Sequence, residues 1–423
     1  MKKCPKKDAP GFIEYGLILG FISILIIAAL TATGGTINHL LGRYHVPANN
    51  RHSPLLISGD YLVNTTSKAT ALNIKTGKIA WRRKENSWFE GAAVDSDTVY
   101  LTFESQFKAF DLKSGKTKFW KPLPSMPAEK YRYIGPLIKR QGPYLIVAKH
   151  RNILCYEKKS NIRIWSWTSR SPDDVAKQTR FSFETTKNHV YVNTCKDIVC
   201  LNRSNGWEQW RRKGHRSLGL AATEPPTIIT LREKYKTIAG LSARGNLLWL
   251  RKLPLEDNDH YTVTRSAAAD EDILIIWSTG PTAYLDSIKA KTGKRNWLYG
   301  PFRGDAFNNY GRPINDADHE HLYTSRPQAN KTHAFFYSSD ATIYQVNLAT
   351  GAGRSIASFH AIGTATYNSW LTGFVPINFI DIHTPITDMA LKDGILYLCT
   401  IGSRYHAFDT KKRKLLWSRR AKE

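Results

Sequence analysis

The sequence predicts an all-β protein, an eight-bladed β-propeller preceded by one N-terminal transmembrane α-helix. Three observations predict this fold class. A turn motif recurs eight times between residues 52 and 420. Short runs rich in β-branched and aromatic residues, bounded by Gly, Asp and Asn, lie between the copies and are typical of strands. A long uncharged apolar stretch precedes them all. About four short strands per copy is the pattern of a propeller blade, and radial repetition of blades leaves few exposed edges.

Each copy of the motif joins a small residue, a turn of the Thr/Ser-Gly-Lys kind and an aromatic residue. The clearest copy is ALNIKTGKIAW, which ends at Trp81. The repeat prediction rests on Gly77, Trp81, Gly115, Trp120, Trp165, Trp210, Trp249, Gly293, Trp297 and Trp417. The copy at residues 348–356 has no Trp, so seven blades remain an alternative if this copy is an insertion.

The residue types in the motif have a mechanical reason. The side chain of Asn73 or Asp111 bonds to its own backbone and opens a hairpin turn. Gly77 and Gly115 supply the positive φ that such a turn requires. We expect the Trp of the last strand to pack against the adjacent blade, with the small residue about ten positions earlier leaving room for it.

This motif resembles the PQQ-type repeat over roughly residues 52–420. The resemblance implies the eight-bladed fold of the quinoprotein alcohol dehydrogenase-like superfamily, which contains quinone-dependent dehydrogenases and binding scaffolds without a cofactor. The enzymes carry two adjacent cysteines against the quinone, and a calcium ion held by Glu, Asn and Asp. No two of the five cysteines here are adjacent, and there is no C-x-x-C-H. We therefore predict no catalytic residue and no cofactor, with a PQQ-dependent dehydrogenase as an alternative.

The N-terminus is predicted to be a membrane element. Residues 1–14 form a basic leader with four lysines before residue 8, and no Asp, Glu, Lys or Arg occurs within the predicted helix, residues 15–42. Residues 43–51 are a linker. Lysines before an apolar run predict a single pass through a bacterial inner membrane, with the propeller on the periplasmic or extracellular side. A cleaved secretory signal is the competing interpretation.

The start of this helix, Ile13-Glu14-Tyr15-Gly16-Leu17-Ile18, resembles Flp-type pilins. In that family a peptidase cuts just before the helix, and a Glu pairs with the new amino terminus of a neighbouring subunit. The resemblance implies an assembly role for Glu14, whose buried carboxylate needs a cationic partner. It implies cleavage before Pro10 or before Phe12. The first cut puts Ala9 where the family has Gly; the second, after Gly11, leaves Glu14 two residues too close to the terminus. A minor pilin displaying a propeller is therefore an alternative, and a plain signal-anchor helix is another.

Other candidate sites are weaker. Cys155 and Cys200 occupy the small-residue position of the motif, so we interpret them as core residues. The segment NDADHEH, residues 315–321, holds a cluster of Asp, Glu and His. Its spacing fits no metal motif, so we interpret it as a solvated acidic loop and predict no metal site.

The charge balance has two interpretations, a basic surface for acidic partners and ordinary solvated charges in turns, of which we slightly prefer the second. The 423 residues include 61 Lys+Arg and 35 Asp+Glu, a formal net charge of +26. The densest basic runs are 82–84, 211–213 and 411–414. An anionic polymer or lipid headgroups fit such a surface, and no specific nucleic-acid module is recognisable. We predict a membrane-anchored, extracytoplasmic, non-catalytic scaffold that binds other proteins of an envelope, pilus or secretion assembly.

Overall fold

The computed structural model describes residues 55–65, 68–85, 91–103, 105–123, 137–149, 152–170, 182–194, 197–220, 225–232, 237–253, 261–279, 282–303, 327–338, 342–358, 360–361, 382–383, 386–400 and 404–420. The chain divides into two units, the first of which comprises residues 1–49 and 308–312. The predicted leader and transmembrane segment belong to that first unit and lie outside the described residues. No helix within the described ranges is long and apolar enough to cross a bilayer. All the described strands belong to the second unit.

The second unit is a propeller, and its strands follow the chain blade by blade. Blades 1 and 2 are β1 (Leu56–Ser58), β2 (Tyr61–Asn64), β3 (Ala69–Asn73), β4 (Ile79–Arg83) and β5 (Gly91–Val94), β6 (Thr98–Thr102), β7 (Gln106–Asp111), β8 (Thr117–Pro122). Blades 3 and 4 are β9 (Leu137–Gln141), β10 (Tyr144–Lys149), β11 (Asn152–Glu157), β12 (Arg163–Thr168) and β13 (Ser182–Thr185), β14 (His189–Asn193), β15 (Asp197–Asn202), β16 (Glu208–Lys213). Blades 5 and 6 are β17 (Arg216–Leu220), β18 (Ile228–Arg232), β19 (Thr237–Leu241), β20 (Leu247–Lys252) and β21 (Tyr261–Ala269), β22 (Asp272–Thr279), β23 (Thr282–Lys289), β24 (Arg295–Arg303). Blades 7 and 8 are β25 (Gln328–Ala329), β26 (His333–Tyr337), β27 (Thr342–Asn347), β28 (Gly353–Ser358) and β31 (Ile386–Lys392), β32 (Ile395–Thr400), β33 (Arg404–Asp409), β34 (Lys414–Arg420). A separate small sheet pairs β29 (His360–Ala361) with β30 (Ile382–His383).

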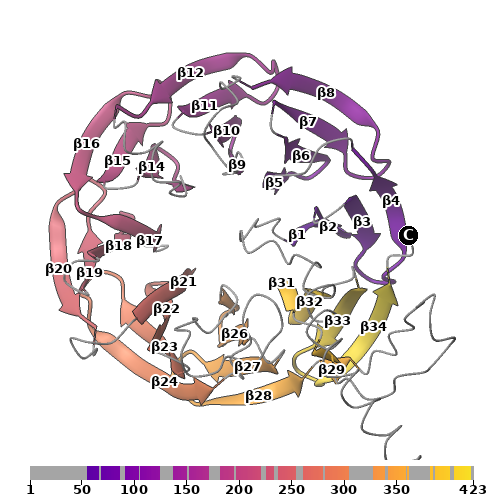
Figure 1. The fold of residues 1–423 in the computed structure, drawn as a ribbon, viewed down its shortest axis with the longest axis vertical. Coiled ribbons are helices and arrows are strands. Elements are labelled where there is room, and N and C mark those ends of the chain that lie inside the picture. Colours follow the sequence, from indigo (N-terminus) through magenta and orange to yellow (C-terminus); the bar gives the residue numbers. More distant parts are fainter. Residues whose placement is uncertain are drawn as a thin grey trace, which may run out of the picture. The chain divides into compact units, whose positions relative to one another are not determined.

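The described residues thus form eight four-stranded antiparallel sheets, each with its strands in sequence order. The first strand of each blade is innermost and the fourth is outermost (Figure 1). The motif copy without a Trp belongs to blade 7, which is a complete sheet from β25 to β28. The prediction of an all-β, eight-bladed propeller is confirmed, and the seven-blade alternative was wrong.

The hydrophobic core of the propeller lies between the blades. The second and third strands are almost wholly buried, as in β6, where all five residues are buried. These buried side chains form eight clusters, and each cluster joins one blade to the next around the whole ring. Removing this apolar surface from water contributes most of the favourable free energy that holds neighbouring blades face to face.

The turns that join the first strand to the second and the third to the fourth lie on one face of the ring, which we call the turn face. Both turns are described in every blade except blade 5, where only the second is. In blade 1 the two turns are linked by a hydrogen bond from the Ile74 amide to the Asp60 carbonyl, 2.9 Å long. The Asn73 side chain accepts bonds from the amides of Lys75 and Thr76 at 3.0 and 3.1 Å, which is the local bonding that opens the predicted hairpin.

Adjacent blades are joined at the turn face by a tryptophan and a glycine. The Trp81 indole N–H donates to the carbonyl of Leu112 in blade 2, at 2.7 Å. The ring lies against Gly115, where a Cβ would be 2.6 Å from an indole carbon. Six blade junctions have this pairing, namely Trp81 with Gly115, Trp165 with Gly206, Trp210 with Gly245, Trp249 with Gly293, Trp297 with Gly351 and Trp417 with Gly77. We call each of these pairs a latch.

The two junctions without a latch show what the glycine is for. In blade 3 the turn position is Asn161, and in blade 8 it is Arg413; both have positive φ, 57° and 51°. These are the blades that follow the two outermost strands without an inward tryptophan, β8 and β28. A residue with a side chain is therefore accommodated at this turn position even though its φ is positive. The glycine is needed wherever an indole covers the turn.

Trp120 differs from the prediction that placed it in the motif. In β8 it is Phe119 that pairs with Ala109, in the position that Trp81 holds opposite Ala71. Trp120 pairs with Lys108 and is 58% exposed. Because side chains alternate along a strand, a shift of one residue turns Trp120 to the outside of the ring.

The ring closes between blades 8 and 1 without any exchange of strands. β1–β4 form one complete blade and β31–β34 another. The Trp417 indole donates to the Ile74 carbonyl at 2.9 Å, and an apolar cluster spans both blades. We call this junction the seam. Its two blades are the first and the last along the chain, so non-covalent contacts hold them together and no connecting loop joins them.

Candidate interaction surface on the outer strands

Several predicted site residues fall outside the described residues. They are Glu14, the residues at the predicted cut (Ala9, Pro10, Gly11 and Phe12), and the acidic cluster within residues 315–321. Among the residues that the structure does describe, no three Asp, Glu, His or Cys side chains gather into a metal-binding group.

The described cysteines are core residues with little reactivity. Cys155, Cys200 and Cys399 are free thiols and are buried. Cys155 and Cys200 lie opposite Trp165 and Trp210 in the small-residue position of the motif. Burial raises the pKa of each of these two thiols to about 12, so neither forms the thiolate that a nucleophile needs near neutral pH.

Two of the three basic runs serve the fold. Arg83 and Arg212 each lie two residues after a latch tryptophan and donate to the carbonyls of Gly115 and Gly245, at 2.8 and 2.7 Å. Arg211 lies 3.0 Å from Asp197 and 2.9 Å from Glu208. These charges therefore bind within the ring, and they are not all available to a ligand.

Buried carboxylates are also used between blades. Asp286 of blade 6 is fully buried and lies 3.0 Å from Arg251 of blade 5 and 2.9 Å from Arg295. Asp95 of blade 2 contacts Arg140 at 2.9 Å and also Lys158, both in blade 3. Breaking one partner of such a buried pair leaves an uncompensated charge, so we interpret both clusters as structural.

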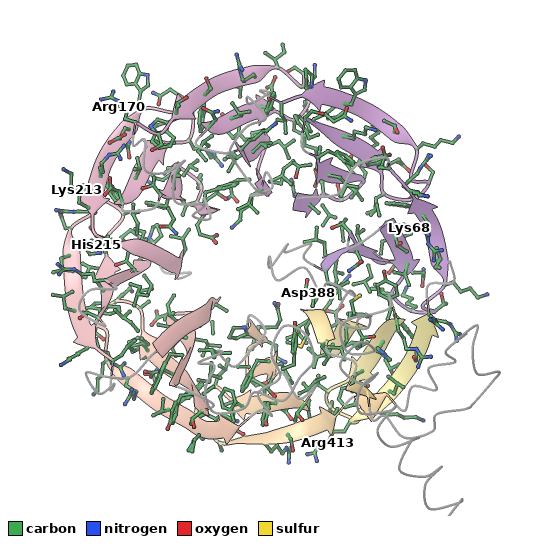
Figure 2. All side chains as sticks on the ribbon, viewed as in Figure 1. Lys68, Arg170, Lys213, His215, Asp388 and Arg413 are labelled. Atoms are coloured by element: carbon green, nitrogen blue, oxygen red, sulfur yellow. The ribbon has the colours of Figure 1, made fainter. Side chains whose placement is uncertain are left out.

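Exposed apolar side chains mark the outer wall, which we define as the eight fourth strands and the turns that lead into them. Within the described part of the chain, every exposed large hydrophobic side chain lies there. They are Ile79, Trp120, Ile162, Ile164, Trp207, Leu247, Leu248, Leu250, Leu298, Leu415 and Leu416. Figure 2 shows the many side chains that project outward from these strands.

Blade 5 has the most apolar section of the outer wall. Leu247, Leu248 and Leu250 on β20 are each about half exposed. Trp207, in the outer turn of blade 4, is 75% exposed, and Leu298 on β24 of blade 6 is partly exposed. Scattered single hydrophobes need no explanation, but a section of strand with three leucines facing water is typical of a surface that another molecule covers.

These leucines were not among the residues predicted from the sequence. In the sequence, the apolar run around Trp249 resembles a buried central strand. An exposed outer strand can have the same hydrophobic periodicity and composition, so the pattern does not separate the two. The signal that distinguishes them is position in the repeat. The strand after the motif turn is always outermost, so only its inward side chains are buried.

Comparison with known proteins shows the fold. A family model described as outer membrane protein assembly factor BamB matches residues 28–216. No curated protein sequence matches the chain significantly. Among solved structures, BamB from Moraxella catarrhalis is similar, with a TM-score of 0.54 and 12% identity over 82% of this chain and 94% of that one.

Two other solved structures have the same architecture. The computationally designed Ika8 protein has a TM-score of 0.57 and 13% identity, covering 82% of this chain and 92% of its own. The dihydro-heme d1 dehydrogenase NirN, solved in complex with DHE, has a TM-score of 0.55 and 9% identity, covering 87% and 75%. One of these is named as a dehydrogenase and another is a design, so the fold does not decide the activity. The chain is an eight-bladed repeat propeller similar to BamB in its fold.

Proposed function

We propose that this protein is a non-catalytic scaffold of the cell envelope whose outer wall binds other envelope proteins. The observation that carries the proposal is the position of the exposed hydrophobic side chains. They lie on the outer strands of a closed ring, with blade 5 the most apolar section. Covering half-exposed leucines with an apolar partner removes them from water, which favours binding by roughly 25 cal/mol for each Å² of apolar surface buried.

The construction of the ring supports a scaffold. Apolar clusters join every pair of neighbouring blades, and six latches tie the turns together. A ring held in this way presents its outer strands in fixed positions, so binding costs little conformational entropy. The match of residues 28–216 to a family described as an outer membrane assembly factor supports the envelope as the place of action.

Residues 1–51 have a separate role in this proposal. We propose that residues 15–42 anchor the chain in the inner membrane and leave the propeller outside the cytoplasm. In the alternative of a minor pilin, cleavage before Pro10 or Phe12 would free the helix for assembly through Glu14. The mass of the N-terminal peptide from native membranes decides between these two, because an anchor keeps its leader and a pilin loses it.

The scaffold is tested with the double variant Leu248→Ser/Leu250→Ser in cells that carry the full chain. Both side chains are about half exposed, so we expect an unchanged thermal midpoint. After cross-linking in intact cells, we expect the variant to be missing from the protein complexes that contain the wild-type chain. The matched control is Ile162→Ser/Ile164→Ser, which removes two exposed apolar side chains from the outer strand of blade 3 and the turn before it, away from blade 5 and from blades 8 and 1. Equal recovery of complexes from wild type and the blade 5 variant contradicts the proposal.

A further inference from the structure

We infer that β34 and the turns at its two ends carry a docking surface for an anionic phospholipid membrane, formed by residues 411–416 of blade 8 and residues 75–79 of blade 1. We call these residues the seam patch. The inference concerns a different ligand and other blades than the apolar section of blade 5 that carries the scaffold proposal, and it stands without that proposal.

Positive charge is concentrated in the outer turn of blade 8. Lys411, Lys412, Arg413 and Lys414 are consecutive and exposed. The one carboxylate within this turn, Asp409, accepts bonds from the backbone amides of Lys411 and Lys412 at 3.0 and 2.9 Å. Among the described residues, no ion pair holds any of the four cations. This basic run, unlike the other two, is not used by the fold.

The turn of blade 1 lies beside the later part of β34, so a second basic turn follows this charge along the same outer strand. Trp417 follows the blade 8 run by three residues, covers Gly77 and donates to the carbonyl of Ile74. Lys75 and Lys78 flank Gly77 and are exposed. Asp60 and Asp393 are the exposed carboxylates on the neighbouring turns, and Asp60 lies 3.5 Å from Lys75. The six cations of the two turns therefore outnumber the acids.

The backbone of Arg413 has a conformation that glycine adopts more readily, so Arg413→Gly removes the charge without disturbing the turn. Its φ of 51° is in the left-handed region, where Gly is at ease, Asn is tolerated and a long side chain is strained. Six of the eight blades have Gly at this turn position, and blade 3 has Asn161. No indole from β28 covers this turn, so the arginine side chain is accommodated and adds its charge to the run. Figure 2 shows Arg413 at the outer margin of the ring, where its charge faces water.

Exposed apolar side chains beside the cations favour a membrane over a soluble polyanion. Leu415 and Leu416 follow the cations directly and are 43% and 45% exposed, and Ile79 follows Lys78 and is 40% exposed. A hydrated polyanion gains nothing from these side chains. The interface of a bilayer accepts both, because lipid phosphates attract the cations and the acyl boundary takes up the apolar groups.

The experiment captures vesicles on the full chain, which is immobilised through a C-terminal tag. Vesicles of phosphatidylcholine alone are compared with vesicles that also contain phosphatidylglycerol, and the readout is the extra capture of the second kind. The basic leader of residues 1–14 also favours anionic vesicles, so the contribution of the seam patch is the difference between wild type and the variants, which share that leader. We expect a clear excess for wild type that falls as salt is raised. In Lys411→Gln/Lys412→Gln/Lys414→Gln the apparent affinity for the anionic vesicles should fall about a hundredfold, since each cation near an anionic surface contributes about a fivefold factor to the affinity.

The controls make the result specific to the seam patch. Lys291→Gln/Lys294→Gln/Lys331→Gln removes three exposed lysines from turns of blades 6 and 7 and should keep the excess. Leu415→Ser/Leu416→Ser should lower it, whereas the equivalent change in blade 5, Leu247→Ser/Leu248→Ser, should not. Arg413→Gly should weaken vesicle capture without lowering the thermal unfolding midpoint, because glycine adopts a φ of 51° readily. A variant that misfolds would show both weaker capture and a lower midpoint.

Three outcomes overturn the inference. One is equal capture of the two kinds of vesicle by wild type. Another is an equal loss from the blade 8 and the control lysine variants. The third is tight binding of soluble polyphosphate that the blade 8 lysine variant loses while the leucine variant keeps it, which would assign the patch to a polyanion. None of these depends on whether blade 5 binds a protein, so the scaffold and the lipid surface stand or fall separately.

Discussion

At the scale of single residues, His406 links stability to pH. It is buried on β33, and burial, with the charge of Arg404 as a smaller cause, lowers the pKa of its imidazole to about 4. The pKa in an unfolded chain is about 6.5. Between these values the unfolded state binds a proton that the folded state does not, so stability is full above pH 6.5 and falls as the pH drops toward 4. Between pH 7 and pH 4.5, His406 is expected to lower the free energy of unfolding by about 2 to 3 kcal/mol.

This prediction is checked by urea unfolding at pH 7 and pH 4.5 of wild type and His406→Gln. The variant should lose less stability than wild type on acidification. Burial also lowers the pKa values of His189, His215 and His333, so some dependence on pH should remain in the variant. The same loss in both proteins would show that His406 is not the acid-sensitive group.

At the scale of elements, the latch explains why a turn residue depends on the neighbouring blade. Gly115→Ala places a Cβ 2.6 Å from the Trp81 indole at a φ of 66°, so overpacking and backbone strain act together. We expect a loss of about 2 to 4 kcal/mol in the free energy of unfolding. Asn161→Gly changes the equivalent turn, where no indole is present, and should change stability by less than about 1 kcal/mol. Urea unfolding of both variants measures the contrast, and equal losses would refute the role of the indole.

Much of each blade could be predicted from the sequence, because the motif fixes local turn chemistry. Asn73, Gly77 and Trp81 act as their types and spacing suggest. The register of β8 differs from the prediction, which chose the tryptophan by its residue type. The spacing from the turn glycine is the signal that finds the inward residue, because Trp81 follows Gly77 by four residues and Phe119 follows Gly115 by four. The same irregular pairing occurs in both blades, so a repeat is better aligned on its turn than on its aromatic residue.

At the scale of the whole molecule, the candidate surfaces depend on the closed ring. Residues 75–79 lie beside the later part of β34, and so continue the exposed strip that begins at residue 411, only because blade 8 contacts blade 1. The sequence shows two unrelated basic turns. Likewise, the leucines of β20 are exposed because β20 is the last strand of its sheet, with no neighbour on its outer side. Such properties belong to topology, and a repeat count alone predicts the ring but not what its closure brings together.

The seam differs from every other junction in having no covalent connection between its two blades. Its contacts include Trp417 with the cluster around it, and bonds from the Tyr405 hydroxyl to Asn64 at 3.3 Å and from the Lys392 ammonium to the Gly59 carbonyl at 2.6 Å. The Leu55 amide also donates to the Asp388 carboxylate. Trp417→Ala should therefore do more than remove a buried indole, which costs about 3 to 5 kcal/mol. It should let blades 1 and 8 separate while the other junctions hold.

Hydrogen exchange of the folded protein measures this separation directly. In Trp417→Ala we expect faster exchange of amides in β2, β3, β32 and β33, with blades 4 and 5 close to wild type. Trp249→Ala removes the latch between blades 5 and 6, where the chain still tethers the two sheets, so its effect should be smaller and confined to that junction. Uniformly faster exchange in Trp417→Ala would mean that the ring opens only by global unfolding. The seam would then be as cooperative as any other junction, and the covalent connections elsewhere would contribute little to holding the blades together.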